Sequence, residues 1–262
     1  MISLNSKGIE STLEIGGYFG LDLPDHGDAF PDALKFQSGR AAIRAVLECA
    51  DIKRVLLPAY ICDSVIQAVV DSGAVVDTYF LDESLYPKDL PSTLPVKCAL
   101  LYVNYFGLCK AIIARLLQDI PNSQLIIDNS QALFALPTSA LANIYSARKF
   151  IGVPDGGLLL TSGLEVKEPE DEDTGSFERI KHLLLRLAYT AQDGFQDYLE
   201  AESSLSNTKP LMMSRLTNRL LASIDMATVK HQRRENFLVL AARLDKFNLH
   251  KWELDSESVP LC

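Results

Sequence analysis

The sequence predicts an α/β fold with a mostly parallel central sheet, flanked by helices and followed by long C-terminal helices. Three observations predict it. Short, nearly continuous apolar runs alternate with helix-like stretches from about residue 34 to 162, which is typical of strands buried on both faces of a parallel sheet. Apolar residues at helical spacing replace this alternation beyond residue 174. Hydrophobic residues make up 48% of the 262 residues, enough for a substantial core.

The expected elements follow in chain order. Strands are expected at 54–61, 75–81, 98–106, 124–128, 143–147 and 156–162. Helices are expected among them at 39–50, 62–72 and 110–119. Two long helices are expected at 175–202 and 212–247, and in the second the apolar residues at helical spacing are Leu216, Leu220, Ile224, Val229 and Leu240.

This pattern divides the chain into four parts. Residues 1–33 are an N-terminal segment, and 34–164 form the α/β domain. Residues 165–174 contain "EVKEPEDED", with six acidic residues and one lysine, and are expected to be a mobile surface loop. Residues 175–262 form the helical region.

Charge and cysteine content exclude several classes of protein. The net charge of −9 argues against a nucleic acid or an anionic membrane as the main partner. Five scattered cysteines (49, 62, 98, 109 and 262) form no CxxC pair, so we expect reduced, buried thiols and no metal site. The sequence shows no signal peptide and no apolar run of the ~18 residues that a membrane span requires. We therefore expect a soluble, cytoplasmic protein.

Polar residues at the ends of the apolar runs are the candidate site, because ligands of open α/β sheets bind at the carboxyl ends of the strands. Ser38, Gly39 and Arg40 begin a helix, where free backbone amides can hold a phosphate, although a plain helix cap fits the same pattern. Tyr60 and Cys62 follow the run at 54–61, and Tyr60 is either a ring-stacking residue or a core aromatic.

Asp128 ends the run at 124–128, Gln131 follows it, and Lys149 comes 21 residues after Asp128. A buried aspartate requires a cation, so a salt bridge between Asp128 and Lys149 is one interpretation. The ordered set of phosphate cradle, aromatic, aspartate and lysine is also what pyridoxal phosphate requires. A lysine amine forms a Schiff base with its aldehyde, and an aspartate keeps its pyridine nitrogen protonated.

Five segments together resemble the DegT/DnrJ/EryC1/StrS family of sugar aminotransferases, a branch of the fold-type I pyridoxal-phosphate enzymes. The resemblance extends from about Gly16 to Asn248, and its most specific elements are "DNSQ" and "K…PDGG". The segments are "FQSGRAAI", "VLLPAYICDSVIQAV", "LYVNYFGL", "IIDNSQALF" and "YSARKFIGVPDGG".

The resemblance implies a fold-type I fold with pyridoxal phosphate as cofactor. It implies that Lys149 carries the cofactor and transfers a proton, that Asp128 meets the pyridine nitrogen, and that Gln131 lies near the phenolic oxygen. The family's phosphate loop falls on Ser38, Gly39 and Arg40, and Ser146 adds a hydroxyl to the phosphate site. The resemblance also implies a homodimer with the active site at the subunit interface, and amino transfer from glutamate to a nucleotide-linked keto-sugar for surface polysaccharides or related sugars.

The sequence departs from the family pattern at several positions. Arg40 stands where the family commonly has threonine, and Cys62 aligns with its ring-stacking aromatic, a role that Tyr60 could take instead. "PLMMS" lacks the asparagine that many members present from the partner subunit. The chain ends at Cys262, where the family's C-terminal subdomain would begin. Lys149 itself argues against the dehydratase branch, which has a histidine there.

The sequence therefore leaves three hypotheses. The first is an aminotransferase that acts on a keto-sugar. The second is a catalytically weak or inactive relative that serves as a partner or regulatory subunit, and it is motivated by the unusual phosphate loop and the missing subdomain. The third is a generic nucleotide-binding protein, which is weaker because neither GxGxxG after a strand nor GxxxxGK[ST] occurs.

Overall fold

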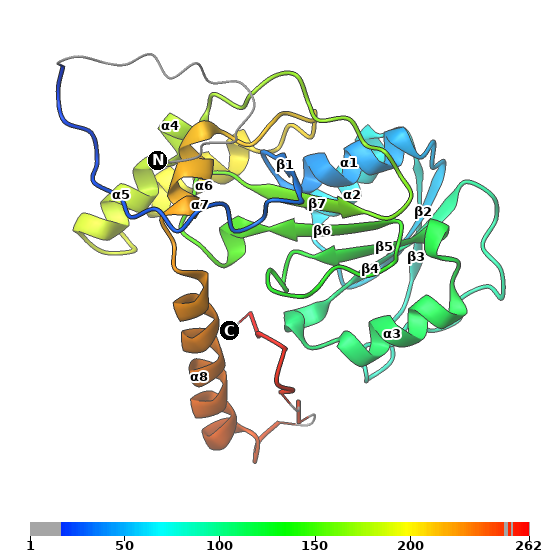
Figure 1. Ribbon diagram of the computed structural model, residues 1–262. Helices are drawn as coiled ribbons and strands as arrows, with labels where there is room; N and C mark the ends of the chain where they lie inside the picture. The colour runs from blue at the N-terminus through cyan, green and yellow to red at the C-terminus, as the bar shows by residue number, and fades with distance from the viewer. Residues whose placement is uncertain (1–16, 249–250, 253, 262) are drawn as a thin grey trace, which may run out of the picture.

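The computed structural model describes residues 17–248, 251–252 and 254–261. The N-terminal residues 1–16 and Cys262 of the sequence predictions lie outside this range. Within the described residues seven strands form one sheet in the order β1-β7-β6-β5-β4-β2-β3 (Figure 1). The strands are β1 (Leu34–Phe36), β2 (Arg54–Pro58), β3 (Val75–Tyr79), β4 (Cys98–Val103), β5 (Leu125–Asn129), β6 (Ala142–Ser146) and β7 (Gly157–Thr161).

The sheet is mostly parallel, as predicted. Strands β3, β2, β4, β5 and β6 pair in parallel, whereas β7 pairs antiparallel with both β6 and β1. Strands β4 and β5 are buried along their whole length, which explains why their sequences are apolar without alternation. The three-residue β1 was not predicted, because so short a segment shows no period.

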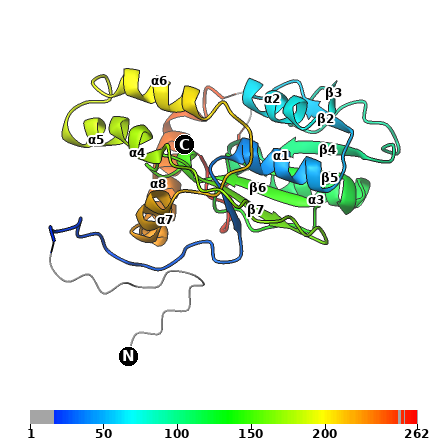
Figure 2. The same ribbon diagram turned by 90° about the horizontal axis from the view of Figure 1, so that it is seen from above.

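Helices cover both faces of the sheet (Figures 1 and 2). Helices α1 (Gly39–Cys49) and α2 (Asp63–Asp71) lie on one face, and α3 (Lys110–Asp119) lies on the other. The chain leaves β2 toward β3 but leaves β4 toward β5, so the two connections diverge between neighbouring strands. This divergence opens a crevice at the carboxyl ends of β2 and β4, the usual ligand position in such sheets.

The helical region is more divided than predicted. The expected helix at 212–247 is broken where Asp225 accepts hydrogen bonds from the backbone amides of Ala227 (3.0 Å) and Thr228 (3.2 Å) and so caps the start of a new helix. The 175–202 segment is interrupted at residues 189–194. The observed helices are α4 (Ser176–Arg179), α5 (Lys181–Ala188), α6 (Phe195–Ser204), α7 (Arg215–Ala222) and α8 (Met226–Leu244).

Two further expectations are corrected. The acidic loop is not wholly a surface loop, because Asp173 is buried and ion-paired with Arg179. Of the described cysteines, Cys98 and Cys109 are buried free thiols as expected, but Cys49 and Cys62 are exposed. No helix in the described part of the chain is both long and apolar enough to span a membrane.

Candidate active site

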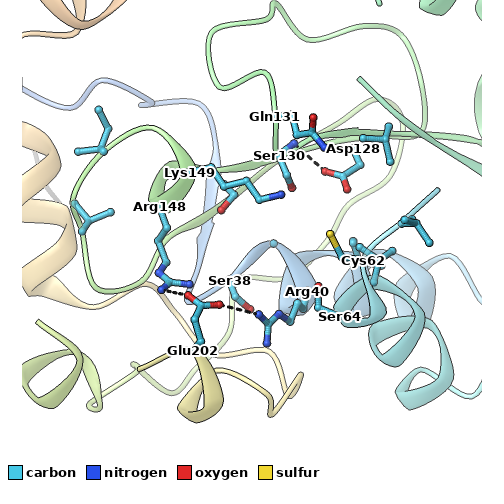
Figure 3. A pocket seen from close by; sticks show the side chains of 18 of the residues that line it. Ser38, Arg40, Cys62, Ser64, Asp128, Ser130, Gln131, Arg148, Lys149 and Glu202 are labelled. Carbon is cyan, nitrogen blue, oxygen red and sulfur yellow. Dashed lines mark hydrogen bonds and ion pairs between the residues drawn. The ribbon is translucent and has the colours of Figure 1, made fainter. Parts of the chain in front are cut away.

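One cavity of about 500 Å³ lies at the carboxyl ends of the parallel strands (Figure 3). The polar residues that follow the strands lie in this cavity, because the chain leaves the sheet at this edge. Every candidate residue from the sequence lines this cavity: Ser38, Gly39, Arg40, Tyr60, Cys62, Asp128, Gln131, Ser146 and Lys149. The fold thus brings together residues that are up to 111 positions apart in the chain.

The N-terminus of α1 forms one wall of the cavity. Ser38 is its N-cap, and its hydroxyl accepts a hydrogen bond from the amide of Ala41 (3.3 Å). The preceding loop lies directly against the "PDGG" turn, where Gly156 (φ +124°) donates its amide to the carbonyl of Gln37 (2.9 Å). The α1 N-terminus therefore presents free amides and a positive dipole end to the cavity, as an anion site does.

Gly157 allows this close approach. A Cβ built at Gly157 would collide with the carbonyl group of Ser38 and lie 2.6 Å from the amide nitrogen of Gly39. Both neighbours are backbone atoms, so they cannot rotate out of the way. The glycine pair of "PDGG" therefore shapes the loop that would hold an anion.

We expect Gly157→Ala to lower the free energy of unfolding by about 3 kcal/mol, because the loop must shift to accept the methyl group. Urea unfolding measures this loss. Gly152→Ala is the matched control, because the nearest atom to its Cβ is a flexible leucine methyl at 3.6 Å. Equal unfolding free energies for the two variants would contradict the close packing described here.

Asp128 occupies the end of β5 between Val103 of β4 and Ile144 of β6. It is 4% exposed, and its Oδ1 accepts a hydrogen bond from the amide of Ser130 (2.8 Å). Its Oδ2 has no hydrogen-bond partner among the described residues. A carboxylate so deeply buried with one free oxygen favours a cationic or N–H-bearing ligand.

Lys149 follows β6 in the short turn Ala147–Lys149, and its side chain extends into the cavity toward Asp128 (Figure 3). The described residues include no hydrogen-bond or ion-pair partner for its amine. The salt bridge between Asp128 and Lys149 that the sequence allowed is therefore not formed. The amine remains available to a ligand placed between Asp128 and the α1 N-terminus.

Aromatic and amide side chains complete the upper wall. The ring of Tyr60 stacks on that of Tyr105, with 5.5 Å between centroids and 12° between planes. The Tyr105 hydroxyl donates to the carbonyl of Tyr60 (2.8 Å), and burial raises the Tyr105 pKa above its usual value. Gln131 accepts a hydrogen bond through Oε1 from the amide of Phe106 (2.9 Å), and its Nε2 has no partner within the described part of the chain. Cys62 directly precedes α2 at the N-cap position, and its side chain forms no capping hydrogen bond.

Two charged residues of the site were missed by the sequence analysis. Arg148 precedes Lys149, and Glu202 comes from α6; both line the cavity and form an ion pair. Arg40 also faces Glu202 (3.6 Å) and donates to the carbonyl of Leu205 (2.9 Å). Burial is the main cause that lowers the Arg40 pKa. "SARK" could have pointed to Arg148, but no local signal links Glu202 to this site.

A buried ionic cluster supports the cavity from behind. Asp155 of "PDGG" is fully buried, and its Oδ2 lies 3.9 Å from Arg179, which also pairs with Asp173. Burial is the largest cause that raises the Asp155 pKa, while Arg179 opposes it. The cluster ties the turn after Lys149 to α4 and to the acidic loop.

The chain directions diverge between β2 and β4 and the cavity lies at the strand ends, which is the ligand position typical of open α/β sheets. No family model matches the chain, and no curated protein matches it. Solved structures share the fold. Sugar aminotransferase CalS13 from Micromonospora echinospora is 14% identical, with a TM-score of 0.51, over 90% of this chain and 67% of its own.

Two other solved structures give the same result. A DegT DnrJ EryC1 StrS aminotransferase from Brucella abortus is 16% identical (TM-score 0.51; 87% of this chain and 63% of its own). Spr1654 from Streptococcus pneumoniae is described as a proposed sugar aminotransferase in its PMP-form. It is 13% identical, with a TM-score of 0.54, over 88% of this chain and 64% of its own. The chain thus spans about two thirds of the length of the structures it resembles.

Proposed function

We propose that this chain is a pyridoxal-phosphate-dependent aminotransferase that moves an amino group, from glutamate, to a nucleotide-linked keto-sugar for surface polysaccharide or related sugar biosynthesis. One observation carries the proposal: the amine of Lys149, which has no partner among the described residues, extends into a cavity between the Asp128 carboxylate and the N-terminus of α1. The names of the solved structures with this fold support the same class of reaction.

The residues present fit the cofactor. The amides of the α1 N-terminus, with the Ser38 and Ser146 hydroxyls nearby, suit its phosphate. The free Oδ2 of Asp128 suits a protonated ring nitrogen, and the Nε2 of Gln131 suits the phenolic oxygen. The stacked Tyr60 and Tyr105 rings form a flat aromatic wall on the cavity.

Each residue would then have a distinct task. When bound, pyridoxal phosphate supplies an electron sink for the carbon that carries the amino group. Asp128 would hold a proton at the ring nitrogen, because its buried carboxylate keeps one oxygen without a hydrogen-bond partner among the described residues and favours an N–H donor there. Lys149 would hold the cofactor covalently and, once released, would move a proton between substrate and cofactor carbons. Ser38 and Gly39 would orient the phosphate.

Visible absorbance tests the proposal. Wild-type protein with pyridoxal phosphate should develop a yellow band, which glutamate should bleach and a nucleotide-linked keto-sugar should restore. Bleaching by glutamate alone would support the first half of amino transfer. Absence of any band, while the protein remains folded by circular dichroism, would contradict the proposal.

A second candidate is a partner or regulatory subunit that keeps the fold but not the activity. It is favoured by Arg40 of the phosphate loop, whose guanidinium group already donates to the carbonyl of Leu205 and lies 3.6 Å from Glu202. A yellow band that no amino donor bleaches would support this candidate over the enzyme.

A cytoplasmic homodimer is part of the proposal. Apolar side chains of α5 and α6, which border the cavity, are exposed and would be covered by a second subunit: Leu184, Leu187, Phe195 and Leu199. Light scattering in solution distinguishes a dimer from a monomer.

A further inference from the structure

Three charged side chains from distant parts of the chain meet on the lower wall of the cavity (Figure 3). Glu202 of α6 lies between Arg40 of α1 and Arg148 of the turn before Lys149. One carboxylate oxygen pairs with Arg148, and the other lies 3.6 Å from Nη2 of Arg40. A carboxylate thus bridges two guanidinium groups beside the α1 N-terminus.

The two arginines have more donors than Glu202 can use. Buried Nε of Arg148 has no hydrogen-bond partner among the described residues, and Arg148 is only 15% exposed. Arg40 is 20% exposed and also donates to Leu205. Two half-buried guanidinium groups that share one carboxylate retain a net positive charge. Such a pair suits an anion that carries more charge than Glu202.

The position of Glu202 allows another anion to displace its carboxylate from the two arginines. Its side chain is 33% exposed, whereas the two arginines are held more deeply, so the carboxylate can rotate toward solvent while the arginines stay in the cavity. A phosphate at the α1 N-terminus would lie close to Arg40, because Arg40 is the second residue of that helix. The negative charge of this phosphate would also repel the carboxylate of Glu202.

We propose that Glu202 occupies an anion-binding site formed by Arg40 and Arg148. A phosphate bound at the N-terminus of α1 then competes with Glu202 for these two arginines. The inference rests on the proposed function only in taking this phosphate to be that of the cofactor. Inorganic phosphate, which forms no bond with Lys149, is therefore the appropriate probe.

Titration calorimetry of inorganic phosphate with Glu202→Gln tests the competition. The amide keeps the size of the side chain but removes the negative charge, so phosphate should bind about tenfold more tightly than to wild type. Pyridoxal phosphate should gain affinity similarly, and pyridoxal without phosphate should not. Glu200→Gln is the matched control, since Glu200 lies on α6 but is exposed and outside the cavity lining.

Weaker or unchanged phosphate binding by folded Glu202→Gln would overturn the inference, because the carboxylate would then position the arginines or be irrelevant to them. Failure of phosphate to bind either protein would overturn it as well. Neither result decides whether glutamate bleaches the yellow band of wild type, so failure of the inference and failure of the proposed function can be distinguished.

Discussion

Lys149→Ala is expected to reduce amino transfer by about 10³-fold or more, because the variant lacks both the covalent attachment and the group that moves the proton. The loss of stability should be small, since the amine of Lys149 has no partner among the residues described. Borohydride treatment followed by peptide mass spectrometry should find the cofactor attached at Lys149 in wild type and at no residue in the variant.

Lys110→Ala is the matched control for this experiment. Lys110 is an exposed lysine of α3 that pairs with Glu257, and it lies outside the cavity lining. It should retain the attachment and the rate. Undiminished amino transfer by Lys149→Ala, or attachment at another lysine of wild type, would show that the site is elsewhere.

Arg179→Met is expected to lower the free energy of unfolding at pH 7 by about 3 to 5 kcal/mol, because it leaves buried Asp155 and Asp173 without their cation. The side chains involved are at most 9% exposed, so water cannot replace the lost charge. Urea unfolding measures the loss, and exposed Arg186→Met of α5 should show little change.

The loss of unfolding free energy in Arg179→Met should depend on pH. Without Arg179 the pKa of Asp155, already raised by burial, rises further, and this carboxyl group binds a proton when the chain folds. A raised folded-state pKa adds stability at low pH that is lost as pH increases. The variant should therefore lie closer to wild type at pH 5 than at pH 8. A deficit independent of pH would argue against an uncompensated carboxylate, and Asp155→Asn should restore part of the stability at pH 8.

The helical half shows the limit of local patterns. The apolar spacing of residues 212–247 predicted one helix, yet Asp225 caps a new helix within it. A helix cap requires only one side chain and two amides, so it interrupts a helix without disturbing the period around it. The acidic loop was likewise predicted as a surface loop from composition, but Asp173 is buried because Arg179, six residues later, lies beside it.

The sequence by itself determined the mostly parallel sheet, because strands buried on both faces must be apolar throughout. It also determined that Gly39 begins a helix and that Asp128 and Lys149 follow strands. Only the tertiary structure decided that Lys149 does not pair with Asp128 and that Glu202 pairs with Arg148. The spacing of apolar residues indicates which face of a helix or strand is buried. Ion pairs depend instead on which elements the fold places side by side, and no local pattern records the position of a residue 54 positions away.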